Sequence, residues 1–451
     1  MAARLAHYDD GPSSSAPHPL WILRHHSPVP VTALAFHEAA AQRDDEDSDD
    51  DEDAADGSLL LVAGDADGQV SLSSVATYRP QHFWQAHAKG SSILGVEALD
   101  DQGGQYHRLV THGRDHKIHF WRARKTSSQP PPSVKAASHA AEDQEKAGKP
   151  ELTVTIEVNA LNFCRFSLLH PTPGQSGDTA FIAVPHTLES GWIDVYSVDL
   201  SSGGTPKAQR IHTAIGKGML SPGGLAAGSS AASGGAMSGG VSRAPITMSL
   251  HLVATEGAGL AILAGYEDGA VRLWKTKKAA HESGASSGSA AADSSAAWSL
   301  VWEEKVHRET VLSTCLSYST DLLISTSADD RLALFAQPTA HPPNWSKANV
   351  LETHKQGRSS LAMLPAAQRR RSGNAKEDES AHIFIVGGWD GRARLYRASP
   401  AADSYDAEII AVLRYHKESV QAVALARSAD DAILAAVAGK DGRISLWKHG
   451  S

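Results

Sequence analysis

The chain has 451 residues, of which 41% are hydrophobic and 21% charged, a composition typical of a soluble globular protein. The formal net charge is -9, but ten carboxylates lie within residues 44–56, so the rest of the chain holds 41 acidic side chains against 42 Lys and Arg. This balance argues against a broad basic surface for nucleic acid.

The N-terminal segment, MAARLAHYDDGPSSSAPHP, has no apolar run after its basic residue, so it does not resemble a secretory signal. No stretch of the chain approaches the ~18 apolar residues that a membrane-spanning helix needs. We therefore expect an intracellular protein without membrane contact, and a disordered tail at residues 1–18. The only cysteines, Cys164 and Cys315, lie in apolar segments, where we expect small buried side chains and neither a disulfide framework nor a thiolate zinc site.

From residue 60 onward one short unit recurs. An apolar stretch leads into a small-residue turn with Asp, and an alternating stretch then ends on an apolar or aromatic residue. Six copies are plain: LLVAGDADGQVSL at 60–72, RLVTHGRDHKIHFW at 108–121, AILAGYEDGAVRLW at 261–274, LLISTSADDRLALF at 322–335, IFIVGGWDGRARLY at 383–396 and LAAVAGKDGRISLW at 434–447. A weaker copy, FIAVPHTLESGWIDVY at 181–196, has Ser190 at the Asp position.

Each unit predicts a β-hairpin. Its first half is a nearly continuous apolar run, as in a strand that is covered on both faces. Asp-Gly, a strong hairpin signal, forms the turn in four copies: Asp67, Asp268, Asp390 and Asp441. The second half alternates, as Val70 and Leu72 show, which places its apolar side chains on one face.

Further strands flank each hairpin. Upstream lies another apolar stretch, often preceded by His, at 25–36, 87–99, 158–166, 245–253, 307–317, 354–364 and 416–426. A linking strand follows the hairpin, for example at 81–87 and 408–416. Four strands in each of seven units predict an all-β fold, a seven-bladed WD40-type β-propeller spanning residues 19–448 as one domain. The terminal aromatics, such as Trp121 and Trp274, would fill the space between blades.

The two ends of the chain predict how the ring closes. The last unit ends at Trp447 with four residues to follow, so it lacks its outermost strand. Residues 20–24 (LWILR) precede the first unit and can supply that strand, which would remove an open sheet edge.

Polar, low-complexity segments lengthen the repeats beyond the ~40–45 residues that a minimal unit needs. They lie at 38–57, 124–150, 220–243, 279–297 and 367–380. Segments of such low hydrophobicity cannot offset the entropy of ordering, so we expect long disordered loop insertions.

Signatures of catalysis and of cofactor binding are weak. The glycine-rich stretch at 221–240 lacks a phosphate-loop Lys-Ser/Thr, and no nucleophile elbow appears. His112, His116 and His119 cluster in a metal-like way but flank a hairpin turn, which argues against a metal site. A repeated His with a later Asp could mimic a catalytic dyad; we favour a hydrogen bond that ties one turn to another. We predict no enzyme, no cofactor and no metal.

Two charged segments have a functional and a plain interpretation. The acidic run at 44–56 could bind a basic partner such as a histone tail, or be a solvated loop, which we favour. Ser48, with Asp51 three residues later, could be phosphorylated by an acid-directed kinase. The basic patch Arg369–Arg371 could be a nuclear address, although a solvated loop tip is favoured.

Several longer strings resemble the ASTRA-associated protein 1 family of fungal WD-repeat proteins, over about residues 19 to 448. They are GDADG at 64–68, AHAKGSSILGV at 86–96, THGRDHK at 111–117, NALNFCRFS at 159–167, AVPHTLESGWIDVY at 183–196, GKGM at 216–219, AGYEDGAVRLW at 264–274, GGWDGRARLY at 387–396 and AGKDGRISLW at 438–447. The repeats depart from the strongest WD pattern, because no strand-ending aromatic is followed by Asp and no Gly precedes the His. The hydrogen-bond network of individual blades is therefore in question, though the ring is not.

The resemblance implies a nuclear subunit of the ASTRA complex, with the cytoplasm as a second location, linked to chromatin remodelling and to maturation of phosphatidylinositol-3-kinase-like kinases. We expect protein partners, no direct nucleic acid and no homo-oligomer. The residue before each turn Asp should project onto one flat face, so Arg114, Glu267, Trp389 and Lys440 are candidate partner contacts, or else ordinary solvated turn residues. Trp389 and Arg114 rank first because Trp and Arg dominate interface energetics.

Two other functions fit a propeller. One is a different binding role, as a G-protein β-like subunit or a ubiquitin-ligase substrate receptor; the former usually carries an N-terminal coiled-coil helix, which residues 1–19 cannot form. The other is a propeller hydrolase, which would need converging acids or a metal in the central channel.

Overall fold

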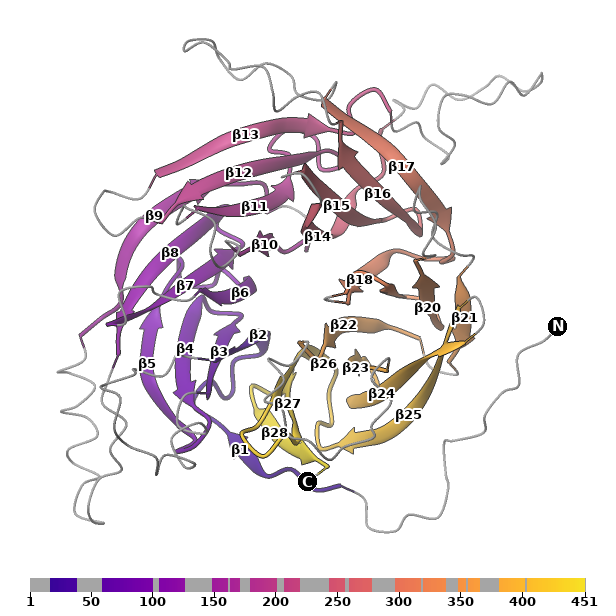
Figure 1. The fold of residues 1–451 in the computed structure, drawn as a ribbon. Coiled ribbons are helices and arrows are strands. Elements are labelled where there is room, and N and C mark those ends of the chain that lie inside the picture. Colours follow the sequence, from indigo (N-terminus) through magenta and orange to yellow (C-terminus); the bar gives the residue numbers. More distant parts are fainter. Residues whose placement is uncertain are drawn as a thin grey trace, which may run out of the picture.

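In a computed structural model, the ring and its turns are described over residues 17–38, 59–99, 105–125, 148–160, 163–170, 179–200, 207–219, 243–255, 259–277, 297–317, 319–337, 348–353, 356–365, 381–401 and 404–450. Within these residues, seven four-stranded antiparallel sheets surround a central axis (Figure 1). The predicted seven-bladed β-propeller is thereby confirmed. No helix of the described part is long and apolar enough to cross a membrane.

The blades are numbered in chain order, and the strands of each blade are given in order from the axis outward. Blade 1 is β2 (Val31–Glu38), β3 (Leu59–Asp65), β4 (Gln69–Ser74) and β5 (Arg79–Gln85). Blade 2 is β6 (Ile93–Leu99), β7 (Tyr106–Gly113), β8 (Lys117–Arg124) and β9 (Glu151–Glu157). Blade 3 is β10 (Ser167–Leu169), β11 (Thr179–Pro185), β12 (Ile193–Asp199) and β13 (Lys207–Ile215). Blade 4 is β14 (Thr247–Thr255), β15 (Gly259–Tyr266), β16 (Ala270–Thr276) and β17 (Trp298–Lys305).

Blade 5 is β18 (Val311–Leu316), β19 (Leu322–Ser327), β20 (Arg331–Ala336) and β21 (Asn349–Glu352). Blade 6 is β22 (Arg358–Met363), β23 (His382–Gly388), β24 (Arg392–Ala401) and β25 (Ser404–Arg414). Blade 7 combines both ends of the chain: β26 (Val420–Arg427), β27 (Ile433–Gly439), β28 (Ile444–His449) and, outermost, β1 (Trp21–Leu23).

The hydrophobic core lies between blades, as the sequence pattern predicts. Every residue of β3 is buried, because this strand is covered by a neighbouring blade on each face. The aromatic residue that ends the third strand packs against the preceding blade. Trp121 of blade 2, for example, meets Trp84 of blade 1 edge to face, with ring centroids 5.8 Å apart, beside Val70 and Leu72.

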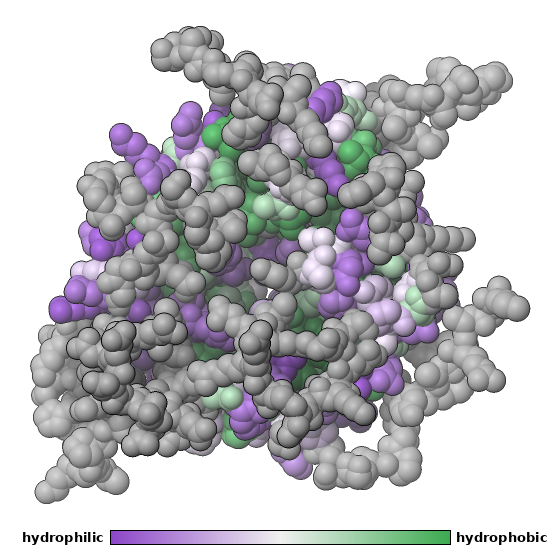
Figure 2. Space-filling model, in the orientation of Figure 1, coloured by the Kyte–Doolittle hydropathy of each residue, from purple (hydrophilic) through white to green (hydrophobic). Residues whose placement is uncertain are grey.

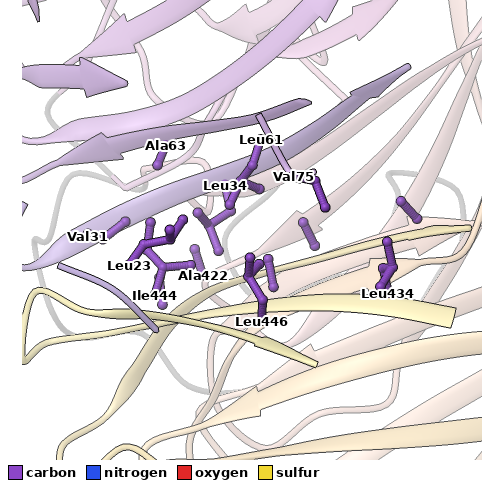
Figure 3. Close-up of a cluster of buried hydrophobic side chains, with 14 of the residues drawn as sticks. Leu23, Val31, Leu34, Leu61, Ala63, Val75, Ala422, Leu434, Ile444 and Leu446 are labelled. Atoms are coloured by element: carbon purple, nitrogen blue, oxygen red, sulfur yellow. The ribbon is translucent and has the colours of Figure 1, made fainter. Parts of the chain in front are cut away.

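The N-terminal strand closes the ring, as predicted. In Figure 1 the indigo β1 lies beside the yellow β28, and their register pairs Trp21 with Leu446 and Leu23 with Ile444. The backbone N–H of Leu20 adds a hydrogen bond of 2.7 Å to the carbonyl of Leu446. Leu23 is buried in a cluster of aliphatic side chains from blades 1 and 7 (Figure 3). The two ends of the chain therefore share one core and one sheet.

Blade 3 corrects one prediction. The sequence placed its innermost strand at 158–166, but the structure forms that strand as the three residues Ser167–Leu169. Residues 163–166 instead carry the chain across the turn end of the blade, where Phe163 is exposed and Phe166 is buried in the core. The apolar residues at 158–166 were mistaken for a strand because a buried connection and a buried strand have similar composition.

A β-bulge interrupts the innermost strand in the other six blades. In each, the pairing between the first and second strands skips one residue near the start of the inner strand; these residues are Thr32, Leu94, Met248, Leu312, Ser359 and Gln421. A bulge breaks the two-residue alternation of side chains and can therefore direct one side chain away from the inter-blade core.

The predicted domain limits, 19–448, and the disordered tail at 1–18 stay predictions. Most of the tail and of the five insertions falls outside the described residues, as do Ser48, the acidic run and Arg369–Arg371. The strands that flank the insertions show where these segments attach. Four of the five connect strand ends at the same end of the ring, between β2 and β3, β8 and β9, β16 and β17, and β22 and β23.

Candidate partner-binding face

One end of the ring carries the turns between the second and third strands of the blades, and we call this end the turn face. The connections from each blade to the next lie there too: the amide of Gly90, between β5 and β6, donates a 2.8 Å hydrogen bond to Asp67 in the β3–β4 turn. The opposite end, where four of the insertions attach, is the far face. Most of the low-complexity sequence is therefore joined to the far face, while the insertion at 220–243, between β13 and β14, is joined to the turn face.

In blade 2, a chain of hydrogen bonds anchors the turn. The indole Nε1 of Trp121 donates to Thr111 Oγ1 at 2.9 Å, and this hydroxyl lies 2.8 Å from Nε2 of His87. Nδ1 of His87 lies 2.8 Å from Asp115, which also accepts from the backbone of Ala88. Burial raises the pKa of Asp115, but these hydrogen bonds outweigh it and lower the pKa to about 2. The predicted His–Asp tie between turns is therefore present.

Blades 7 and 5 repeat the pattern. His416 contacts Asp441 at 3.1 Å and Ser445 at 3.0 Å, and Trp447 donates to the same Ser445 hydroxyl at 2.8 Å. In blade 5, His307 lies 3.3 Å from Asp329 and 2.8 Å from Ser325. The network is therefore complete in blade 7, although the sequence has no Asp after Trp447. Blade 5 lacks only the indole, because Phe335 stands in place of Trp.

In blade 1 the partner of His26 is not the turn residue Asp67 but Asp65, two residues earlier, at 2.7 Å. Asp65 is fully buried at the end of β3, and its other oxygen accepts from the amides of Asp67 and Gln69. The Asp-Gly pair that indicates the hairpin in the sequence therefore forms the turn, whereas Asp65 forms the hydrogen bond with His26.

Blades 4 and 6 use arginine in place of histidine. Arg272 is 1% exposed and donates to Asp268 at 2.8 Å and to Glu303 at 3.1 Å, and its guanidinium lies over the ring of Tyr266. Arg394 donates to Asp390 at 2.7 Å in the same i, i+4 arrangement. Neither arginine was predicted, because the repeat pattern pointed only to His upstream of the hairpin.

Blade 3 has the most divergent turn. Asn159 donates to Ser190 at 3.2 Å, so these two residues stand where other blades have His and Asp. A second pair, His186 and Asp194, forms within the hairpin at 2.8 Å. Leu188, inside this longer turn, is 85% exposed.

The four predicted contact residues all lie on the turn face, and their side chains differ in availability. Arg114, Trp389 and Lys440 are exposed. Glu267 is half-buried and ion-paired with Arg243 at 3.2 Å. Arg114 lies over the ring of Phe163, 4.6 Å from its centroid. Their role in binding stays a prediction.

A cavity of about 710 Å³ lies on the axis of the ring, and two of the predicted residues, Trp389 and Lys440, line it. Phe163 and Arg165 of blade 3 line it as well. The sequence analysis missed these two because it placed them within a strand. The string NFCRF at 162–166, with an aromatic and a cation in the most divergent blade, is the signal that could have revealed them. Around the middle of the ring, Figure 2 shows hydrophobic residues between hydrophilic ones.

The histidines that the sequence suggested as metal-like do not converge. His112 is fully buried beside Phe166, whereas His116 is exposed and accepts from the amide of Ala160. A different trio, His87, Asp115 and His119, has its ligand atoms within 4.8 Å of one another. Both nitrogens of His87 already take part in the hydrogen-bond chain of blade 2, so a metal would have to break that chain.

The two cysteines are free thiols. Cys164 is fully buried, as predicted, whereas Cys315 is half-buried. Burial raises the pKa of Cys315 to about 11 and that of Cys164 further, so both thiols are unreactive near neutral pH.

Comparison with known proteins identifies the family. Residues 407–448 match the model described as "WD domain, G-beta repeat". Over 429 residues the chain is 30% identical to ASTRA-associated protein 1 of Verticillium alfalfae, covering 92% of this chain and 82% of that protein. The chain belongs to the ASTRA-associated protein 1 family. A protein of the same name from Schizosaccharomyces pombe is 27% identical over 447 residues, covering 96% of this chain and 99% of the other.

Among solved structures, that of Chaetomium thermophilum Raptor is similar in fold. The TM-score is 0.52 at 12% sequence identity, and the match covers 96% of this chain and 28% of that one. At this level of identity the likeness concerns the fold alone.

Proposed function

We propose that this chain is a non-catalytic scaffold subunit that binds other proteins through its turn face. The observation that carries the proposal is the pairing of a closed ring with exposed Trp389 and Arg114 on the face to which one of the five insertions is joined and four are not. Exposed Trp and Arg side chains held by rigid turns are the residues that contribute most to protein interfaces. The family supports a subunit role, because its members bear the name of an associated protein.

The complex we propose is the ASTRA complex, in the nucleus and also in the cytoplasm. On this proposal the chain contributes to chromatin remodelling and to maturation of phosphatidylinositol-3-kinase-like kinases, as the family resemblance implies. Direct nucleic-acid binding, membrane contact and homo-oligomer formation are not part of the proposal.

The state of the His–Asp pairs supports a non-catalytic role. A His–Asp pair bonded to a hydroxyl, as in a Ser–His–Asp triad, can act on a substrate only where the substrate reaches that hydroxyl. In blades 2, 5 and 7 both nitrogens of the histidine are hydrogen-bonded, to Asp on one side and to Thr or Ser on the other. The hydroxyl-bearing residues Thr111, Ser325 and Ser445 are fully buried within the blades, so a substrate does not reach them and the pairs hold turns together.

Affinity purification of the tagged full-length chain from its native source, followed by mass spectrometry, tests the proposal. We expect a defined set of protein partners, reduced by the double substitution Trp389→Ala and Arg114→Ala. Leu152→Ala, at a 47% exposed residue of the outer strand β9, is the matched control and should leave the set intact. Recovery of no partner, or an unchanged set with the folded double variant, contradicts the proposal.

A further inference from the structure

The axial cavity is lined mainly by residues of the innermost strands, including their bulged residues. All six bulge residues, Thr32, Leu94, Met248, Leu312, Ser359 and Gln421, lie in its wall. Blade 3 contributes Arg165 and Phe163 instead. All seven blades therefore contribute to one cavity, and its volume is within the range of ligand-binding pockets, about 300–1,000 Å³.

The charge of this wall has one sign. Arg165 and Lys440 are the charged side chains of the lining, both are cations, and no carboxylate of the described part lies within 4.0 Å of either. Glu97 is the nearby acid of blade 2, but it is not part of the lining. Burial raises the pKa of Glu97, and the charge of Arg165 opposes that shift.

Two aromatic rings stand at the cavity from blades 3 and 6. Trp389 is 50% exposed, and the other side of its indole lies on Gly357, where an added Cβ would come within 2.0 Å of the ring. The backbone N–H of Trp389 also donates to the carbonyl of Gly357 at 2.9 Å. Phe163 is 67% exposed and lies under the guanidinium of Arg114. The ring of Trp389 is therefore held in place before any partner arrives, which lowers the entropic cost of binding.

The wall also offers a hydrogen-bonding group suited to a polypeptide backbone. The amide of Gln421 donates to Ser419 at 2.7 Å, which leaves its carbonyl oxygen to accept from a backbone N–H. Few, well-placed polar groups among apolar ones are typical of a specific binding pocket.

We propose that the axial cavity binds an extended acidic segment of a protein partner, with carboxylates at Arg165 and Lys440 and an apolar side chain against Trp389 or Phe163. This inference rests on the proposed scaffold function and names the chemistry of the partner segment. A nucleic acid is also anionic and stacks on aromatic rings. It needs several phosphate contacts, however, and two lining cations on a chain with a formal net charge of -9 supply too few.

Selection from a library of random peptides of about 12 residues, displayed on phage, tests the inference with the purified full-length protein. We expect enrichment of peptides that carry Asp or Glu together with an aromatic or large aliphatic residue. Their affinity should fall by about tenfold or more in the double variant Arg165→Ala, Lys440→Ala, and in Trp389→Ala. Peptides without acidic bias, or no enriched peptides at all, overturn the inference.

Charge reversal sharpens the test. Arg165→Glu with Lys440→Glu should reject the acidic peptides and select basic ones, whereas Arg397→Glu, at an exposed residue of β24, should select the same peptides as the wild type. Gly357→Ala places a Cβ against the ring of Trp389 and also strains the backbone at a φ of 77°, and we expect it to weaken binding like Trp389→Ala. Circular dichroism checks that each variant is folded. Equal affinity of the wild type and the charge-reversed variant for acidic peptides overturns the inference, as does tighter binding of single-stranded DNA than of any selected peptide.

The two proposals fail in different ways. If tagged protein recovers partners that are unaffected by the Arg165 and Lys440 substitutions, the scaffold function stands and the cavity is not the docking site. If it recovers no partner while selected acidic peptides still bind in the cavity, the cavity inference stands and the scaffold function fails.

Discussion

Trp121 donates its indole N–H to Thr111, ten residues earlier in the chain, and the same hydroxyl meets His87 on its other side. All three side chains are buried between blades 1 and 2, where water cannot replace a lost partner. Thr111 therefore joins the outer aromatic of the blade to the His–Asp tie of the turn face.

Replacing Thr111 with Val tests this connection, because Val has the same shape without the hydroxyl. The substitution leaves two buried polar atoms without a partner, each of which costs about 1–3 kcal/mol. We expect the free energy of unfolding to fall by about 2–4 kcal/mol in urea denaturation. Thr111→Ser keeps the hydroxyl and should lose about 1 kcal/mol or less, for the missing methyl group. Equal stability of the two variants would show that the hydrogen bonds contribute nothing.

Leu23 tests the closure of the ring. It is 4% exposed in the core shared by blades 1 and 7, so Leu23→Ala should destabilise the protein by about 2–4 kcal/mol. Removing residues 1–25 should lower the melting temperature further and promote self-association, because β28 would then have an open edge. Leu20→Ala, at a residue 47% exposed, is the control, with an expected change within about 0.5 kcal/mol. A truncated chain as stable as the full one contradicts closure.

Arginine in blade 4 should not be replaceable by lysine. Arg272 contacts two carboxylates and a tyrosine ring at once, which the planar guanidinium allows and a single ammonium does not. We expect Arg272→Lys to lower the unfolding free energy by about 1–3 kcal/mol. The exposed Arg397, 4.0 Å from Glu408, offers the comparison, and Arg397→Lys should change stability by less than about 0.5 kcal/mol. Similar effects of the two substitutions would contradict the structural role of Arg272.

Acid should destabilise the fold before the carboxylates titrate. Burial lowers the pKa of His107 and His112 to about 3, and of His25 and His119 to about 4. In the unfolded chain these groups take up protons near pH 6.5, whereas the folded state keeps them neutral to lower pH. The unfolded state therefore binds more protons below about pH 6.5, and stability falls as the pH drops from about 7 to 4.

Denaturant midpoints measured at several pH values check this expectation. His112→Leu removes one of the buried titrating groups, and no described residue accepts or donates a hydrogen bond to either of its ring nitrogens. We expect this variant to be at least as stable as the wild type near pH 5 and to show a shallower pH dependence. Midpoints that stay constant between about pH 7 and 4 would contradict neutral buried histidines.

Much of the ring could be predicted from the sequence, because hairpins and strand alternation are local. The apolar run before each Asp turn becomes a strand buried on both faces, and the missing outer strand after Trp447 indicates that residues 20–24 complete the last blade. Which side chains meet across a turn is not local. His26 pairs with Asp65 and not Asp67 because the end of β3 brings Asp65 beneath the imidazole, a geometry that spacing along the chain does not reveal.

The axial cavity was harder to foresee. A bulge shifts the pairing by one residue, and the sequence of the innermost strands does not show that Thr32 and Ser359 leave the regular alternation. Arg165 and Phe163 were hidden in an apolar stretch that looks like a strand. Trp389, Lys440 and Arg114 could be placed on the turn face because they immediately precede a turn Asp, whose position the hairpin determines.

Hydrogen–deuterium exchange of the segment 20–24 in the intact chain tests most directly that the ring is closed by its own N-terminus. The register of β1 on β28 and the bond from Leu20 to Leu446 predict slow exchange there, comparable with that of β28. Exchange as fast as that of an unstructured peptide, with β28 still protected, would contradict closure by this strand and with it the rigid face on which the proposed binding depends.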